Sequence, residues 1–414
     1  MDELDALRQV RTNLAQEENP DHIALRTGWR PDDTGSVPRR APRRGRFGLK
    51  LPLAGVAAVT AVAAGAVAVV SLPSDDRAPA PGQAGTGTDL RILDRGDVLL
   101  VAATNAQKAT AQGRYWLSQR VSADVFTIGK RRADHYKVEY RQRYRSWVGV
   151  DGYNASAHDD LPGRPVTPQD EARWRAAGSP ERLDGVPSAE GPIVLFMPGS
   201  RFSKTPPWPG PDKVWNFHGL TLQQVNALPT EPKALENVLL GLKGDWRVAG
   251  RGDGKDEPMR ALRGAERVRA LSETAGELLS NAPAPPKVRA AAFRMMAALP
   301  GVKAEGRGTD PLGRHGAVVT LPVTSINPLG LYTVNKQLGT YRRQWVIDPA
   351  RGALLAIRNV VVTPPKGSRK LPPGDNGKPR KLTVADMPDR FHKPGEVVSY
   401  EVFERTEWTN AKPH

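Results

Sequence analysis

The sequence predicts an α+β fold for residues 90–414, in which an antiparallel sheet is covered by helices. Residues 136–148 alternate apolar and charged side chains, as expected of a strand with one covered and one solvated face. Three segments between residues 231 and 299 repeat apolar side chains at helical spacing. Further strand-like stretches follow between residues 315 and 408. This order of elements predicts a sheet with a helical layer on one face.

One transmembrane helix is predicted before this domain, at residues 51–72. These 22 residues carry no charged side chain, and their larger apolar residues include Leu51, Leu53, Val56, Val62, Val67, Val70 and Leu72. At about 1.5 Å per residue they extend about 33 Å, which is enough to cross a hydrocarbon core of about 30 Å. A cleaved signal peptide is the main alternative, because Ala66-Val67-Ala68 supplies the small residues of a cleavage site. A buried soluble helix is the second alternative.

Basic residues immediately before this segment predict its orientation. They are Arg39, Arg40, Arg43, Arg44, Arg46 and Lys50. Two aspartates and one arginine follow the segment at residues 75–77. Positive charge is retained on the cytoplasmic side of a membrane. The sequence therefore predicts a single-pass plasma-membrane protein with a cytoplasmic N-terminus and an extracytoplasmic C-terminal domain, whose first partner is the lipid bilayer.

Four regions are expected along the chain. Residues 1–50 form a cytoplasmic tail, which contains a short amphipathic helix at about Met1–Leu14 and the arginine-rich run. The transmembrane helix at 51–72 is followed by a flexible Pro/Gly/Ala linker at 73–89 and by the folded domain at 90–414. The amphipathic helix predicts a cytoplasmic protein partner for the tail, although a helix lying on solvent or lipid has the same pattern.

Charge and cysteine content narrow the classes of partner. The chain has no cysteine, which excludes disulfides, thiolate metal ligands, cysteine nucleophiles and a lipid-modified cysteine. Its formal net charge is +16, and residues 73–414 hold +14 of it, with 50 Lys and Arg against 36 Asp and Glu. Outside a cell, this charge would attract anionic lipid headgroups or envelope polymers, and we expect no nucleic acid there. Arginine-rich codon usage is the alternative origin of the charge.

The elements expected beyond the linker alternate between helices, strands and loops. Helices are predicted at Ile92–Ala111, Glu231–Leu242, Glu266–Ser280 and Pro286–Leu299. Strands are predicted at Tyr115–Val121, Tyr136–Val148, Ile193–Met197, His315–Val323, Tyr341–Ile347, Ala353–Val362 and Glu396–Trp408. Leu161–Pro192 and Arg201–Pro211 look like loops, and Thr363–Pro394 is an excursion rich in Pro, Gly and Lys. Thr230 is expected to cap the second helix, and Asp151-Gly152 is a hairpin turn signal.

The sequence contains no constellation that predicts catalysis. None of the seven histidines lies in an HExxH context, and no G-x-S-x-G elbow occurs. His158-Asp159-Asp160 is the densest group of metal-ligand types, but we expect it in a solvated loop without a second histidine. Asp348 starts an Asp-Pro-x-x-Gly turn and is expected to be structural. We therefore predict no enzyme, no catalytic residue, no metal site and no cofactor.

Aromatic and arginine side chains are concentrated between Tyr136 and Trp147. Such a face is able to stack bases or sugars. Tyrosine at every second strand position is more often packed on a core, and an external location disfavours nucleic acid.

Several segments resemble an uncharacterised family of actinobacterial single-pass membrane proteins. They are YWLSQRV from residue 115, SWVGVDG from 146, LPTEPKALENVLLGL from 228, NAPAPPKVRAAAFRMMAALPGVK from 281, TDPLGRHGAVV from 309 and RRQWVIDPARGALLAIRNVVV from 342. The resemblance covers most of the chain, implies its membrane-anchored architecture and brings no catalytic residues. More distantly, the domain resembles LolA and RseB, which implies a half-barrel sheet with a helical lid and a concave apolar face for acyl chains or a partner segment. Fold likeness by itself does not establish function.

Three functions are compatible with this architecture. The first is a non-enzymatic binding or sensor module outside the membrane, connected to the tail inside. The second is a carrier or chaperone for lipids or lipoproteins, a hydrophobic ligand that requires an apolar pocket between the sheet and the helices at 231–299. The third is an anti-sigma-like regulator acting through residues 1–50, although the His and Cys pairing of zinc-containing anti-sigma domains is missing.

Overall fold

The computed structural model describes residues 97–110, 112–188, 192–200, 207–209, 215–242, 245–247, 256–324, 338–371 and 378–413. The chain divides between Gly87 and Thr88 into two units, and every described residue belongs to the second. The predicted tail, transmembrane segment and linker therefore lie outside the described residues. None of the helices within the described ranges has the length and apolar content needed to cross a membrane.

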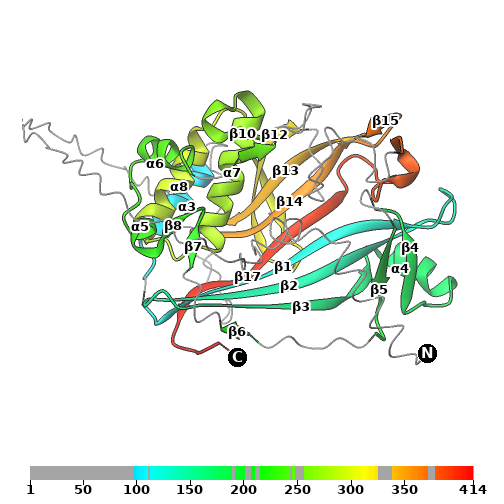
Figure 1. Cartoon of the computed structure of the whole chain (residues 1–414), viewed down its shortest axis with the longest axis horizontal. Coiled ribbons are helices and arrows are strands. Elements are labelled where there is room, and N and C mark those ends of the chain that lie inside the picture. The colour runs from blue at the N-terminus through cyan, green and yellow to red at the C-terminus, as the bar shows by residue number, and fades with distance from the viewer. Residues whose placement is uncertain are drawn as a thin grey trace, which may run out of the picture. The chain divides into compact units, whose positions relative to one another are not determined.

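A large antiparallel sheet dominates the second unit, as predicted for an α+β fold (Figure 1). Among the described residues it has nine strands in the order β11–β12–β13–β14–β17–β1–β2–β3–β6. The strands are β1 (Tyr115–Ile128), β2 (Tyr136–Gly149), β3 (Asn154–Pro165), β6 (Trp208–Pro209), β11 (Lys303–Thr309), β12 (His315–Thr324), β13 (Thr340–Asp348), β14 (Ala353–Thr363) and β17 (Val397–Thr409). The last strand, β17, pairs with both β14 and β1 and so joins two meanders into one sheet.

Six helices and four small two-stranded sheets are described around the large sheet. The helices are α3 (Asp97–Gln107), α4 (Pro168–Ala176), α5 (Leu222–Asn226), α6 (Pro232–Leu239), α7 (Gly264–Ser280) and α8 (Pro286–Ala298), with the 3-10 turns η1 (Met259–Ala261) and η2 (Val384–Asp386). The small sheets pair β4 (Arg182–Val186) with β5 (Ile193–Phe196), β7 (Asn216–Phe217) with β8 (Leu220–Thr221), β9 (Asp245–Arg247) with β10 (Asp256–Pro258), and β15 (Ser368–Leu371) with β16 (Arg380–Thr383). Figure 1 shows α3, α6, α7 and α8 grouped near β12–β14. Helix α4 lies with β4 and β5 beside the right-hand end of β1–β3 in this view.

Local sequence explains where two of the helices start. In α6, Pro232 occupies the first turn, where a missing N–H is tolerated, and Glu231 accepts a hydrogen bond from a first-turn amide at 2.7 Å. In α4, Thr167 and Asp170 form a capping box, in which each side chain accepts a hydrogen bond from the other residue's backbone N–H. The prediction that Thr230 caps the second helix is wrong by one residue, because Glu231 occupies that position.

The helical layer packs on one face of β12, β13 and β14 through a continuous apolar core. Trp345 on β13 and Phe293 on α8 are fully buried in this core. A Cβ atom added at Gly276 of α7 would lie 2.8 Å from the Cδ1 atom of Ile357 on β14, so glycine permits the close approach of helix to sheet. At this point, α7 lies directly against the side chains of Ile357 and Trp345.

Most predicted helices and strands are confirmed, with shifts at their ends. The three helices between residues 231 and 299 correspond to α6, α7 and α8. The predicted helix Ile92–Ala111 corresponds to α3, and its residues 92–96 and 111 lie outside the described residues. The predicted strand Tyr115–Val121 is the first half of β1, which continues to Ile128.

Several segments expected as loops contain regular structure. Leu161–Pro192 includes the end of β3, helix α4 and strand β4. Helix α4 was not predicted because it is too polar to show an apolar stripe. Thr363–Pro394 includes β15 and β16. The edge strand β11 was missed, since its sequence KAEGRGT is rich in charge and glycine. His158, Asp159 and Asp160 lie within β3 and not in a loop.

The prediction that β2 has one solvated face is also wrong. On the face opposite to the helical layer, Lys137 and Glu139 are buried. Glu139 accepts hydrogen bonds from Arg164 at 2.6 Å and from Tyr400 at 3.0 Å, and the Lys137 ammonium group lies 2.6 Å from the Glu396 carboxylate. Charged side chains can be buried here because each meets a partner on a neighbouring element.

Candidate binding surface

One row of paired residues crosses six strands of the large sheet on the face that α7 covers. Residues directly opposite each other on antiparallel strands point to the same face. From β13 to β3, the row consists of Trp345, Ile357, Glu401, Ser122, Gln142 and Asp160. The row is apolar and buried on β13 and β14, but polar and only partly buried on β17, β1 and β2, and exposed on β3. This face therefore changes from protein core to accessible surface between β14 and β17.

A second row lies beside the first and carries a stack of three side chains. Arg120, Tyr144 and His158 are paired across β1, β2 and β3. The rings of Tyr144 and His158 are stacked, with centroids 4.9 Å apart and planes 24° apart. The Arg120 guanidinium lies 5.0 Å from the Tyr144 ring centre, a cation–π distance. The His158 side chain is 44% exposed, so solvent reaches the stack at β3.

Hydrogen bonds around Gln142 connect the two rows. The Gln142 amide nitrogen donates to the Tyr140 hydroxyl at 2.7 Å and to the Asp160 carboxylate at 3.0 Å. The Gln142 carbonyl oxygen accepts from the Tyr144 hydroxyl at 2.8 Å. Both ends of the amide are satisfied, which fixes the two tyrosines relative to each other. We call the set of Arg120, Tyr140, Gln142, Tyr144, His158 and Asp160 the polar strip.

The end of α7 holds the polar strip at β1. Asn281 follows the last turn of α7, and its side-chain oxygen accepts hydrogen bonds from Ser118 at 2.8 Å and from Arg120 at 3.1 Å. The Glu401 carboxylate lies 3.7 Å from the Arg120 guanidinium. The helical layer thus positions the cation that stacks on Tyr144.

The polar strip combines ring faces with fixed hydrogen-bond donors and acceptors, which is chemistry suited to a polar ligand. It does not form a metal site. Asp159 points to the opposite face of β3 and pairs with Arg145 at 2.8 Å, so the His158-Asp159-Asp160 group does not converge. No group of His, Cys, Asp or Glu within the described ranges is arranged to hold a metal ion.

No protein-family model, curated protein or solved structure matches this chain. The polar strip is therefore interpreted from its own geometry. The residues predicted to cross the membrane at 51–72, and the basic residues predicted to precede them at 39–50, lie outside the described residues. Those two predictions stay predictions.

A second polar group is buried beside the start of β13. The Tyr341 hydroxyl donates to the Asp389 carboxylate at 2.7 Å, and burial raises the pKa of Tyr341. Burial also raises the pKa of Asp389 to about 6, and burial together with the charge of Lys137 lowers the pKa of His392 to about 4. Neither ring nitrogen of His392 has a hydrogen-bond partner in the described part of the chain. Asp389 and His392 are each only 2% exposed, so we expect this group to affect stability and not ligand contact.

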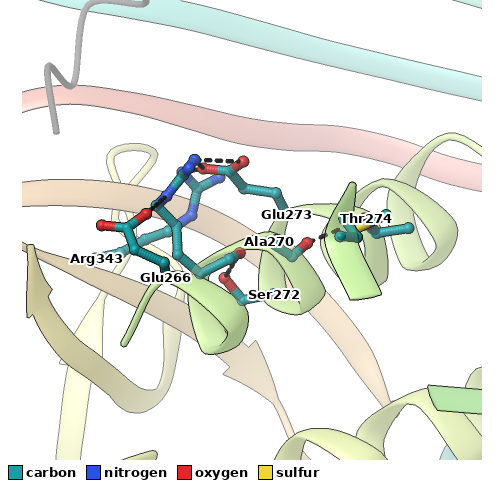
Figure 2. Close-up of polar contacts among 8 residues, drawn as sticks. Glu266, Ala270, Ser272, Glu273, Thr274 and Arg343 are labelled. Carbon is teal, nitrogen blue, oxygen red and sulfur yellow. Dashed lines mark hydrogen bonds and ion pairs between the residues drawn. The ribbon is translucent and has the colours of Figure 1, made fainter. Parts of the chain in front are cut away.

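A third polar group fastens α7 to the sheet (Figure 2). Arg269 donates to Glu266 at 3.1 Å and to Glu273 at 3.0 Å, and Glu273 also lies 3.4 Å from Arg343 on β13. Burial alone would lower the pKa of Arg269, but the charges of Glu273 and Glu266 raise that pKa above its ordinary value. This cluster is separate from the polar strip and has a structural role.

The sequence alone indicated only part of the polar strip. The tyrosines of β2 were recognised as an aromatic strand face, but His158 and Asp160 were expected in a loop. His158, Asp159 and Asp160 are three polar residues in a row, so the apolar/polar alternation that indicates a strand is absent there. The buried group of Tyr341, Asp389 and His392 has no signal in the sequence, because Tyr341 is 48 residues away from Asp389.

Proposed function

We propose that this chain is a membrane-anchored, non-enzymatic binding protein. Its α+β domain would lie outside the membrane and bind a hydroxyl-rich ligand, such as a carbohydrate, along the polar strip. The observation that carries the proposal is the change of one sheet face from buried core to accessible aromatic and polar side chains. Sugar rings suit such a surface, because their C–H faces contact aromatic rings while their hydroxyl groups bond to amides and carboxylates.

The close packing of α7 on the sheet supports this function over a lipid carrier. A carrier would need an apolar pocket between the sheet and the helices at 231–299. Where α7 crosses the sheet, the side chains of Trp345 and Ile357 lie against Gly276 instead. We further propose that the sheet is curved as a half-barrel, as in LolA and RseB. In this proposal, the ligand binds on the polar strip and not in the core.

Anchoring by residues 51–72 rests on the uncharged length of this segment and on the basic run from Arg39 to Lys50. A sensor role follows if occupation of the polar strip is reported to the cytoplasmic tail. The anti-sigma-like version of this role requires a cytoplasmic protein that binds residues 1–50.

An oligosaccharide array probed with the full-length chain in neutral detergent tests the polar strip. Titration calorimetry with the best-bound oligosaccharide then compares variants. Tyr144→Ala and Asp160→Asn should each weaken binding about tenfold, because stacking or a charged hydrogen bond contributes roughly 1 to 2 kcal/mol. Asp184→Asn, an exposed carboxylate on β4, is the matched control and should bind like the wild type. Binding that is unchanged in Tyr144→Ala and Asp160→Asn contradicts the proposal, as does an array without any bound oligosaccharide.

A further inference from the structure

Two paired strands, β15 and β16, follow β14 and lie in a strongly basic part of the sequence, and we call this strand pair the hairpin. The basic residues from position 366 to β16 are Lys366, Arg369, Lys370, Lys378, Arg380 and Lys381. Asp375 is the only acidic residue between positions 366 and 381. Four of the six basic residues are lysines, although arginine is the commoner basic residue in this chain. The compact charge of lysine suits a diffuse anionic surface, whereas arginine suits a single bidentate partner.

The strand register places like charges opposite each other in this hairpin. Lys370 on β15 pairs with Lys381 on β16, and both side chains are exposed. Like charges at directly opposed positions destabilise a strand pair. In the described part of the chain, neither ammonium group has an ion-pair partner. The ammonium groups of Lys370 and Lys381 repel each other, and an external anion that lies against both of them removes this repulsion.

The hairpin nevertheless has a defined structure. Leu382 is 2% exposed and packs with Leu338 and Met387 beneath the hairpin. The backbone N–H and the hydroxyl of Thr383 donate to the Asp386 carboxylate at 2.8 and 2.6 Å, which fixes the chain where β16 ends. The face with Lys370 and Lys381 is therefore held outward by a buried anchor on the other face.

We infer that the hairpin of β15 and β16 rests on the anionic phospholipid surface of the membrane that anchors the chain. The inference rests on the proposed anchor at residues 51–72 but not on the polar strip. The predicted linker at residues 73–89 can extend at most about 60 Å. That length exceeds the diameter of roughly 50 Å expected for a compact unit the size of residues 88–414. The tether therefore lets the hairpin reach the membrane and keeps lipid at a high effective concentration.

Full-length chain in lipid nanodiscs tests this inference. The absence of natural cysteines allows a single dye-labelled cysteine at Ser368, which shares the outward face with Lys370. Energy transfer from this dye to a labelled lipid reports contact between hairpin and membrane. Nanodiscs of phosphatidylcholine alone are compared with nanodiscs that also contain phosphatidylglycerol. Ala177→Cys, at the exposed end of α4, is the control position for the dye.

Transfer from residue 368 should rise with anionic lipid and fall again at high salt, because exposed charges are screened. The double variant Lys370→Glu with Lys381→Glu should lower the ratio of bound to free hairpin at least roughly 30-fold. This follows because each lysine near an anionic surface strengthens binding about fivefold. A second double variant, Lys108→Glu with Lys303→Glu, makes the same change in net charge at exposed lysines elsewhere and should keep the wild-type transfer.

Three outcomes overturn the inference. The first is equal transfer in nanodiscs with and without anionic lipid. The second is an equal loss in both double variants, which would make the effect one of net charge. The third is a response to added inorganic polyphosphate without a response to anionic lipid, which would identify a polymer partner. A chain that does not enter nanodiscs at all refutes the proposed anchor as well, so the two failures are distinguishable.

Discussion

His392 has an environment that disfavours its charged form. Burial and the charge of Lys137 lower the pKa of His392 in the folded state to about 4, although Glu396 and Asp170 act in the opposite direction. In the unfolded chain this pKa is about 6.5. The unfolded state therefore takes up the proton first as the pH falls, and stability is lost between about pH 6.5 and pH 4. The full loss is about 3 kcal/mol.

We predict that His392→Phe removes this loss. Between pH 7 and pH 5, the free energy of unfolding of the wild type should fall by about 2 kcal/mol more than that of the variant. Urea unfolding at the two pH values measures the difference. His315→Phe, at an exposed histidine on β12, is the control and should keep the wild-type pH dependence. The same pH dependence in His392→Phe and the wild type would show that His392 does not stay neutral in the folded chain.

Asp389 should shift stability in the opposite direction. Burial raises the pKa of Asp389 to about 6, against about 3.9 in the unfolded chain, despite the hydrogen bond from Tyr341. The stabilisation of the folded state that comes from the raised pKa of Asp389 is fully present below about pH 3.9 and is lost as the pH rises through 6. Asp389→Asn should therefore gain about 2 kcal/mol relative to the wild type between pH 4 and pH 7.5, measured by urea unfolding. Asp184→Asn should show no such trend, and a pH-independent offset in Asp389→Asn contradicts the prediction.

At the scale of single elements, the ion cluster on α7 can be compared with an ordinary helical ion pair. Arg269 is 11% exposed and contacts Glu266 and Glu273, whereas Arg175 on α4 is 68% exposed and contacts Glu171 four residues earlier. Arg269→Met leaves two carboxylates close together without their shared cation. We predict a loss of about 2 kcal/mol in the free energy of unfolding for Arg269→Met. The control Arg175→Met should lose less than about 0.5 kcal/mol. Urea unfolding at low ionic strength measures both losses, and equal losses would show that solvent screens the cluster fully.

Elements with a strong apolar pattern were predictable from the sequence. Helices α7 and α8 present apolar stripes that the core buries, and β13 and β14 consist largely of residues that favour strands. Helix α4 is specified by its capping box and by the Arg175–Glu171 ion pair, which the apolar pattern does not report. Strands β11, β15 and β16 are held by pairing to a neighbour, so their charged and glycine-rich sequences look like loops.

The polar strip could not be assembled from the sequence because it depends on register. Tyr144 meets His158 only when β3 pairs with β2 in one alignment, and an irregularity near Glu139 shifts that alignment. A slip of one residue would move every side chain of β3 to the other face. The aromatic character of β2 was therefore predictable, whereas the partners of its tyrosines were not.

At the scale of the whole domain, the C-terminal strand is what makes the polar strip continuous with the core. Strand β17 lies between β14, which α7 covers, and β1, which carries Arg120. Glu401 on β17 stands directly between Ile357 and Ser122 in the row of paired residues. Through Glu401, which lies 3.7 Å from the Arg120 guanidinium, β17 links the buried part of this sheet face to the polar strip.

The orientation of the whole chain is the property most directly testable from its charges. Basic residues within about 15 to 20 residues of a membrane segment determine which end stays in the cytoplasm. Arg39, Arg40, Arg43, Arg44, Arg46 and Lys50 all fall within that range of Leu51. An alkaline phosphatase fused after His414 should be active outside the cytoplasm in the wild type.

We predict that replacing these six basic residues with Gln, together with Asp75→Arg and Asp76→Arg, reverses the charge balance and leaves much of the fused phosphatase inactive in the cytoplasm. Arg8→Gln with Arg11→Gln is the control, because these arginines lie too far from residue 51 to influence orientation. Phosphatase activity in whole cells, divided by the amount of fusion protein, measures the orientation. An inactive wild-type fusion would contradict the external location on which the carbohydrate ligand and the hairpin–membrane contact both depend.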